Sequence, residues 1–291
     1  MLFGTRKHLI PTVLAFSLFA ISNTSQAHGP DPVNGLLTPE SVIQAADGKI
    51  YVSEINEFGK DGDGQIRMID HGKSSVLVQG LDDPKGLAII GKDLYVADKS
   101  RIWRIDLSQS PAQAEVFTAA TDFPQVPQFL NDLAADANGN LYVSDSGDIM
   151  GTGKGGAIYK ITPQRKLSLV IDGKADPRVL APNGLLADAK GEHLLIVDFT
   201  SGILFNYDLT SHKLQEIASG FGGGDGIVKQ ANGTVYVSDW KSGKIYRVEN
   251  NKAVLVKEGY QSAADIALSQ DDHHLLVPDM KAGALDVIKL K

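Results

Sequence analysis

The chain has 291 residues, a net charge of −7 and no cysteine. The lack of cysteine excludes disulfide bonds and thiolate metal sites. Nucleic-acid binding normally requires a basic face, so the acidic balance argues against a nucleic-acid partner.

The N-terminal segment, residues 1–27, has the pattern of a secretory signal peptide. Two basic residues precede an apolar stretch (9–21), and a short polar segment ending in Ala27 follows it. The alternative is a membrane anchor, but this stretch is shorter than the ~20 residues that a spanning helix needs. We therefore expect cleavage before His28, a periplasmic or secreted protein without a membrane span, and a single domain over residues 28–291.

One pattern recurs six times along the rest of the chain. Each copy has an apolar segment, a turn with Gly, Asp or Asn, and a second strand that ends on an acid, as in LNDLAADANGNLYVSD. Pairs such as Asn138-Gly139 suit the positive φ of hairpin turns. The closing acids, which lie 40 to 53 residues apart, are Glu54, Asp98, Asp145, Asp198, Asp239 and Asp279. Their recurrence in every copy favours a repeated structural bond over chemistry.

Further strands follow the hairpins, such as RIWRIDL and SVLVQGL. Four short antiparallel strands in a repeat of ~40–50 residues are typical of a β-propeller blade. The sequence therefore predicts an all-β, six-bladed β-propeller with four antiparallel strands per blade. The last repeat lacks a fourth strand, and we expect residues 33–37 to supply it and close the ring.

A polar residue opens the inner strand of every copy. Counting back thirteen to fifteen residues from the closing acids, according to turn length, gives Glu40, Lys85, Asn131, Asn183, Asp225 and Asp265. Equivalent positions in six blades form a ring around the propeller axis, so these side chains converge on one end of the channel. Asn and Asp before Gly also serve strand entry and turns, but six aligned polar positions favour a shared site.

The oxygen-rich ring indicates a divalent-cation site. Carboxylate and amide oxygens suit Ca²⁺, Mg²⁺ or Mn²⁺, whereas Zn²⁺ prefers nitrogen and sulfur ligands. We expect Glu40, Asn183 and Asp225 to bind the metal, with Asn131 as a fourth ligand directly or through water. Ca²⁺ is the first expectation, and Mg²⁺, Mn²⁺ and Zn²⁺ are alternatives.

These motifs resemble the senescence marker protein (regucalcin)/gluconolactonase family of six-bladed, metal-dependent propellers. The matching residues are Glu40 in PES, Asn183 in PNG, Asp225 in GDG and Asn131 in LND. The resemblance implies a lactonase-type hydrolase with a divalent cation. Three departures concern the substrate. Ser41-Val42 stand where the family usually has Gly-Pro, Leu133 takes the place of the glycine in the family's NDG motif, and Lys85 projects a cation into the ring.

The expected reaction is metal-assisted hydrolysis of a small-molecule lactone or ester. Asp225 is the first candidate for the carboxylate that takes a proton from the attacking water, and Asp265 is the second. Asn131 would orient the carbonyl or a substrate hydroxyl. Lys85 would neutralise the ring or bind a substrate carboxylate, and Asp265 is also a candidate substrate contact.

Two other functions fit the same sequence. One is a non-catalytic periplasmic propeller that binds a ligand or protein partner. The other is a phosphotriesterase-like hydrolase on the same site, since one metal and one ring serve several chemistries.

Two glycine-rich stretches resemble ligand loops without meeting their requirements. GTGKGG (151–156) is expected between two strands and lacks the helix of a dinucleotide site. KDGDGQ (60–65) lacks the glycine register of an EF-hand.

Overall fold

The computed structural model describes residues 1, 2, 4 and 29–290, and these form an all-β structure with one 3-10 turn, η1 (Ala120–Asp122). The predicted signal peptide, residues 1–27, lies almost entirely outside this range. Within the described part of the chain, no helix is long and apolar enough to cross a membrane.

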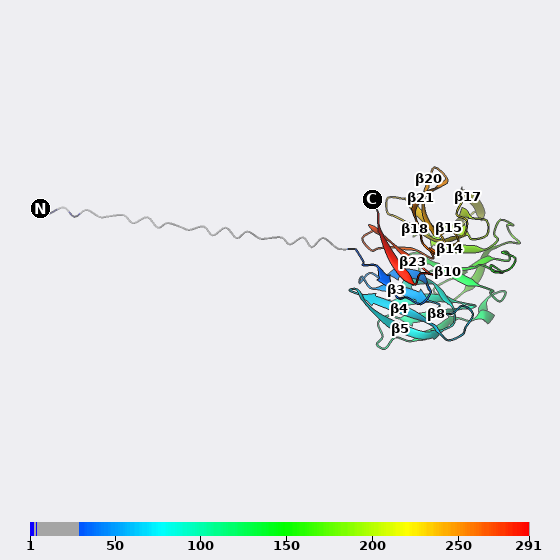
Figure 1. Ribbon diagram of the computed structural model, residues 1–291, viewed down its shortest axis with the longest axis horizontal. Coiled ribbons are helices and arrows are strands. Elements are labelled where there is room, and N and C mark those ends of the chain that lie inside the picture. Colours follow the sequence, from blue (N-terminus) through cyan, green and yellow to red (C-terminus); the bar gives the residue numbers. More distant parts are fainter. Residues whose placement is uncertain (3, 5–28, 291) are drawn as a thin grey trace.

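The strands form antiparallel sheets in which neighbours in sequence are neighbours in space (Figure 1). One sheet contains β2 (Pro39–Gln44), β3 (Ile50–Glu54), β4 (Gly64–Asp70) and β5 (Lys73–Leu81). The next contains β6 (Pro84–Ile90), β7 (Asp93–Asp98), β8 (Arg101–Asp106) and β9 (Ala114–Thr118). A third contains β10 (Leu130–Ala135), β11 (Leu141–Asp145), β12 (Ala157–Ile161) and β13 (Leu167–Asp172). These sheets confirm the prediction of four antiparallel strands per repeat.

The next two repeats form one eight-stranded sheet. Its first group is β14 (Pro182–Ala187), β15 (His193–Asp198), β16 (Ile203–Asp208) and β17 (Lys213–Ser219). Its second group is β18 (Gly224–Lys229), β19 (Val235–Asp239), β20 (Lys244–Glu249) and β21 (Lys252–Glu258). The two outer strands share a single parallel pair, Ser219 with Lys252. The described chain therefore has five sheets where the sequence predicted six.

The last sheet joins the two ends of the propeller. It contains β22 (Ala267–Leu268), β23 (His274–Asp279), β24 (Ala284–Lys289) and the N-terminal β1 (Val33–Asn34). Val33 pairs with Leu285, and Asn34 pairs with Ala284. The prediction that residues near 33–37 supply the missing strand is thus confirmed, and Figure 1 shows the blue start of the described fold beside the red C-terminal strand.

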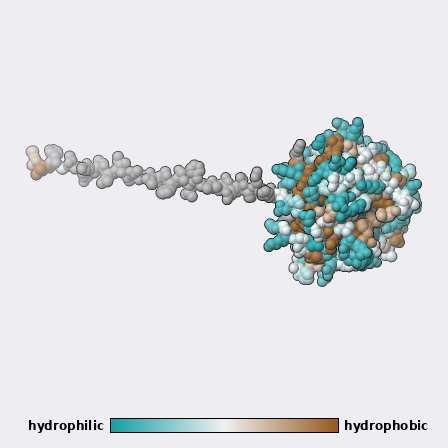
Figure 2. All heavy atoms as spheres, viewed as in Figure 1, coloured by the Kyte–Doolittle hydropathy of each residue, from teal (hydrophilic) through white to brown (hydrophobic). Residues whose placement is uncertain are grey.

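The core lies between neighbouring sheets. One buried cluster joins Tyr95 and Ile102 of one sheet to Leu133, Val143 and Tyr159 of the next. Second strands such as β11 are buried along their whole length, whereas the outer strand β5 is largely exposed. This pattern explains why LYVSD-type segments are apolar on both faces. On the surface, Figure 2 shows apolar patches interspersed with hydrophilic residues.

The closing acids hold each inner strand to the end of the second strand. The Asp198 carboxylate accepts hydrogen bonds from the backbone N–H groups of Leu180 and Ala181 at 2.9 and 2.8 Å. Asp279 accepts equivalent bonds from Gln261 and Ser262 at 2.9 and 3.0 Å. Buried backbone donors need such partners. The prediction of a repeated structural bond is confirmed.

Candidate metal and substrate site

A β-bulge at the start of each inner strand turns one side chain toward the axis. In β2, Pro39 pairs with Glu54 but Val42 pairs with Val52, so two residues oppose one. Extra residues of this kind re-aim side chains, often next to active sites. Register shifts at the same place occur in β6, β10, β14 and β18.

Five of the six predicted ring residues line one cavity of ≈ 420 Å³, and all five are buried. They come from five inner strands and are Glu40, Lys85, Asn131, Asn183 and Asp225. The structure therefore brings together the four residues predicted to bind the metal, although they are up to 185 positions apart in the chain. We call these five side chains the cavity floor.

Three buried oxygens of the floor have no hydrogen-bond partner. They are Glu40 Oε2, Asn183 Oδ1 and Asp225 Oδ1. A buried polar atom without a partner costs free energy, and three such oxygens in one cavity suit a hard cation such as Ca²⁺. Among the described residues, no group of three His, Cys, Asp or Glu side chains is arranged to hold a metal. The fit therefore depends on amide oxygens beside two carboxylates.

Asn131 and Lys85 are held by bonds that leave specific atoms for a ligand. Asn131 Nδ2 donates to Ser146 Oγ at 3.0 Å, which leaves the amide oxygen for a cation or substrate. Lys85 Nζ donates to the Asp83 carbonyl at 3.0 Å and lies 4.3 Å from the centre of the Phe129 ring. Lys85 thus places a buried positive charge beside the predicted metal ligands without ion-pairing to them.

Burial and mutual repulsion raise the carboxylate pKa values on the floor. The pKa of Glu40 is raised well above its usual value by burial first and by the nearby Asp225 charge second, with Lys85 opposing. Burial, followed by the charges of Asp265 and Asp132, also raises the pKa of Asp225. Burial lowers the pKa of Lys85. A bound divalent cation would remove this repulsion between the ionised carboxylates.

The predicted ring position of Asp265 is wrong. Ala263 pairs with Asp279, so the residue that follows it, Ala264, holds the ring position that Glu40 holds in β2. The turn between β22 and β23 has one residue more than the count assumed. Asp265 lies one position further on, where its carboxylate accepts a hydrogen bond from Ser41 Oγ and lines a different pocket.

Asp265 and Asp132 occupy equivalent positions, each one residue after the ring position of its inner strand. Asp132 accepts hydrogen bonds from the backbone N–H groups of Leu185 at 2.7 Å and Leu133 at 2.6 Å. It therefore connects β10 to β14. Burial raises the pKa of Asp265 to about 7. Neither carboxylate lines the floor cavity, so the proposed roles of Asp265 as substrate contact and second base lose their geometric basis.

Close packing around the axis explains the glycines of the NG and DG motifs. Gly184 and Gly226 lie inside strands β14 and β18, not in turns. A Cβ atom on Gly184 would collide with the carbonyl oxygen of Asp225, and one on Gly226 would collide with the Asp265 carboxylate. The small residue lets neighbouring inner strands approach so that the floor oxygens converge.

The cavity walls are largely apolar and come from loops. We call six side chains the apolar wall: Phe58, Phe129, Met150, Phe199, Trp240 and Met280. Three of them directly follow closing acids, namely Phe199, Trp240 and Met280. The regular position directly after the closing acid is the signal in the sequence that could have identified these three residues.

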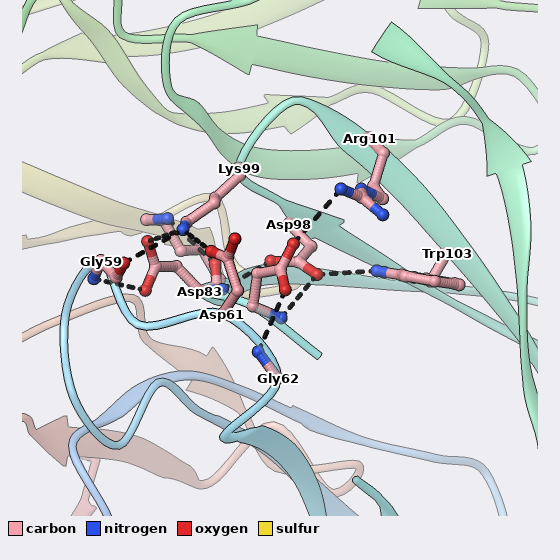
Figure 3. Close-up of polar contacts among 10 residues, drawn as sticks. Gly59, Asp61, Gly62, Asp83, Asp98, Lys99, Arg101 and Trp103 are labelled. Carbon is pink, nitrogen blue, oxygen red and sulfur yellow. Dashed lines mark hydrogen bonds and ion pairs between the residues drawn. The ribbon is translucent and has the colours of Figure 1, made fainter. Parts of the chain in front are cut away.

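The loop that carries Phe58 is fixed from the neighbouring sheet. Figure 3 shows Lys99 between Asp61 and Asp83, and its Nζ lies 3.8 Å from Asp83 Oδ2. Asp83 Oδ1 in turn accepts the N–H of Gly59 at 2.9 Å. Lys99 also ion-pairs with Asp61. Asp61 of KDGDGQ therefore serves loop packing, which agrees with the rejection of an EF-hand.

The GTGKGG stretch lies between β11 and β12, as expected, and its first three residues line the cavity. Met150, just before it, is 85% exposed, and Phe58 is 51% exposed. These two side chains mark the outer edge of the cavity. The loop's contribution to the cavity was not foreseen from the sequence.

Comparison with known proteins supports the resemblance seen in the motifs. A candidate gluconolactonase of known structure superposes with a TM-score of 0.70 at 15% identity, over 89% of this chain and 92% of the other. A calcium-binding regucalcin from Agrobacterium tumefaciens strain C58 gives 0.68 at 18% identity, over 88% and 90%. Likeness at this identity shows a shared β-propeller fold. No curated protein sequence matches the chain.

A family model covers the middle of the chain. It is described as the SMP-30/gluconolactonase/LRE-like region and matches residues 86–259. That range includes Asn131, Asn183 and Asp225, while Glu40 lies before it. The matched segment is more than half of the chain. The protein therefore belongs to the SMP-30/gluconolactonase/LRE-like family.

Proposed function

We propose that this protein is a metal-dependent hydrolase of the gluconolactonase type that cleaves a lactone or ester in the floor cavity. The observation that carries the proposal is the set of three unpartnered buried oxygens from Glu40, Asn183 and Asp225. The family and the calcium-binding neighbour support a divalent cation there, with Ca²⁺ as the first candidate. A purely structural channel would gain nothing from these oxygens, because unpaired buried polar atoms are destabilising.

Each floor residue has a proposed role. Glu40, Asn183 and Asp225 would hold the cation, and Asn131 would present its amide oxygen to the cation or to the substrate. When bound, the cation would polarise the ester carbonyl and acidify a water molecule. The raised pKa of Asp225 suits a carboxylate that accepts a proton from that water. Lys85 would balance the negative charge or bind an anionic substrate group.

We also propose the wider setting of the enzyme. The signal-peptide pattern supports export to the periplasm or outside the cell, with residues 28–291 as one domain. The eight-stranded sheet is interpreted as two joined blades, which gives six blades in all. The expected partner is a small-molecule lactone or ester, not a nucleic acid.

The test combines metal binding with a substrate panel. Calcium titration by calorimetry, and hydrolysis of lactones, aryl esters and phosphotriesters with and without chelator, would be measured for the wild type and Asp225→Ala. We expect wild-type lactone or ester hydrolysis that chelator abolishes. In Asp225→Ala, both calcium binding and turnover should fall at least ~100-fold, because one carboxylate serves both.

The control is Glu216→Ala, which removes an exposed carboxylate from the outer strand β17. It should bind calcium and hydrolyse substrate like the wild type. Retained turnover in Asp225→Ala would refute the assignment. Turnover restricted to phosphotriesters would favour the phosphotriesterase alternative, and a wild type that binds no divalent cation and hydrolyses nothing would favour a non-catalytic propeller.

A further inference from the structure

We infer that the substrate carries an apolar body, such as an alkyl or aryl group on the lactone ring, in place of the hydroxyl-rich ring of a sugar lactone. This inference rests on the proposed function, because it concerns the same cavity. The cavity is polar at its floor and apolar along its walls. A molecule that fills it must match both parts.

The wall provides contact area but few hydrogen bonds. Phe58, Phe129, Met150, Phe199, Trp240 and Met280 form it, and they come from six different loops. Ring hydroxyls that are buried against such side chains lose their water partners without gaining new ones, which is unfavourable. An alkyl or aryl group gains free energy from the same burial.

Two polar groups beside the wall, the Trp240 indole N–H and the Lys241 ammonium, already contact wall residues. Trp240 Nε1 donates to Met280 Sδ at 3.2 Å. The Lys241 ammonium lies 4.2 Å from the centre of the Phe199 ring, and the Phe199 and Trp240 rings are 6.2 Å apart. The other polar side chains that line the cavity above the floor are those of Thr152 and Thr200. These hydrogen-bonding groups are few for a substrate with hydroxyls around its ring. Sites that select hydroxyl groups provide a hydrogen-bond partner for each of several of them.

The outer edge of the wall has apolar surface that is exposed to solvent. Phe58 is 51% exposed and Met150 is 85% exposed, and both border the cavity. A substrate group extending from the floor toward the mouth would cover them. The floor fixes the carbonyl, so chain length on the substrate determines how much of this surface is buried.

The experiment uses a series of γ-lactones with alkyl chains of increasing length, together with D-glucono-δ-lactone, on the calcium-loaded wild type. We expect kcat/KM to rise with chain length by up to about fourfold per methylene, mainly through KM, until the wall is covered. D-glucono-δ-lactone should be a poorer substrate than the longest alkyl lactones. Phe58→Ala and Trp240→Ala should flatten the dependence of kcat/KM on chain length.

The matched control is Leu255→Ala, because Leu255 is 47% exposed but lies on the outer strand β21. It should keep the full dependence on chain length. A preference for D-glucono-δ-lactone with no dependence on chain length would overturn the inference and leave the proposed function intact.

A binding measurement separates the inference from the reaction. Alkyl γ-lactams of the same lengths keep the ring and chain but resist hydrolysis, and the chain has only two tryptophans, Trp103 and Trp240. We expect lactam titration to change a fluorescence signal that is lost in Trp240→Phe, with affinity rising along the series. Length-dependent lactam binding without lactone hydrolysis would support the apolar ligand class and refute the hydrolase proposal. Binding that does not depend on length would refute the apolar ligand class.

Discussion

Glu40 illustrates how a residue can be unfavourable for the fold and useful for binding. Its carboxylate is buried beside Asp225, and Oε2 has no hydrogen-bond partner. Because burial and then Asp225 raise its pKa, the folded metal-free protein binds a proton at Glu40 more tightly than the unfolded chain does. The free energy of unfolding of the metal-free protein therefore decreases as the pH rises from the pKa of Glu40 in the unfolded chain toward its pKa in the folded protein. Such costs are common where binding requires converging charges.

Glu40→Gln should stabilise the metal-free protein and weaken metal binding. In chelator, we expect the free energy of unfolding to rise by about 1–3 kcal/mol near pH 8, because the glutamine removes a carboxyl group that must either bury its charge or take up a proton on folding. The gain should shrink toward pH 4, where Glu40 is protonated in both states. Urea denaturation at several pH values would measure it. A variant that is less stable than the wild type at pH 8 in chelator would contradict this account of the floor.

The sequence predicted most of the residues that form the cavity floor. The one error, at Asp265, has a physical cause. Counting back from the closing acids identified Glu40, Asn131 and Asp225 correctly, because the bulge recurs in each inner strand. It failed at Asp265, because an unrecognised extra turn residue shifted the count by one. A better reference was the large aliphatic residue directly after the bulge, which is Val42, Leu87, Leu133, Leu185, Ile227 or Ile266 in the six copies. The ring residue lies two positions before it in every copy, which indicates Ala264 before Ile266.

At the scale of elements, the loops above the floor determine which substrates fit the cavity. The hairpin period and turn chemistry predicted the inner hairpins and many of the outer strands, but they contain no information on how loops fold over the cavity. Phe58 reaches the cavity because its loop is tied to the neighbouring sheet through Lys99 and Asp83 (Figure 3). Those partners are about 25 to 40 residues from the loop. Contacts of this kind depend on the assembled fold and have no local sequence signature.

Lys99→Met should loosen this loop without unfolding the protein. Exposed ion pairs contribute only ~0–1 kcal/mol, so global stability should change little. We expect KM for long alkyl lactones to rise about three- to tenfold while kcat is retained, because the Phe58 wall contact is lost but the floor is intact. Limited proteolysis should cut more rapidly within residues 57–63.

Two variants check that the effect belongs to the tether. Lys99→Arg keeps a cation near Asp61 and Asp83 and should restore most of the wild-type KM. Lys92→Met removes a lysine that pairs with Asp106 at 2.7 Å, away from the cavity, and should leave the kinetics unchanged. Equal effects of Lys99→Met and Lys92→Met would rule out a specific role of the loop tether.

At the scale of the whole molecule, the ring is closed by segments from opposite ends of the chain. The inner strands follow one another as β2, β6, β10, β14, β18 and β22, and β22 again contacts β2. The strand β1 pairs with β24, and the backbone N–H of Leu36 donates to the Gly283 carbonyl at 2.9 Å. Because the floor takes side chains from five of these strands, ring closure and site geometry are coupled.

A chain that starts at Thr38 should therefore lose both stability and metal affinity relative to one that starts at His28. Truncation removes the β1 pairing and exposes the pocket of Leu36, which is 5% exposed and packs with Leu276 and Leu285. Losing one buried leucine costs about 2–5 kcal/mol, so we expect Tm to fall by at least ~5 °C.

Leu36→Ala separates packing from strand pairing and should reproduce a large part of the fall in Tm. Asp31→Ala changes an exposed residue before β1 and should match the wild type. Calcium affinity should fall in the truncated chain, because Glu40 lies only two residues after the new N-terminus. An unchanged Tm in the truncated chain would show that β1 does not close the ring, whatever its effect on calcium.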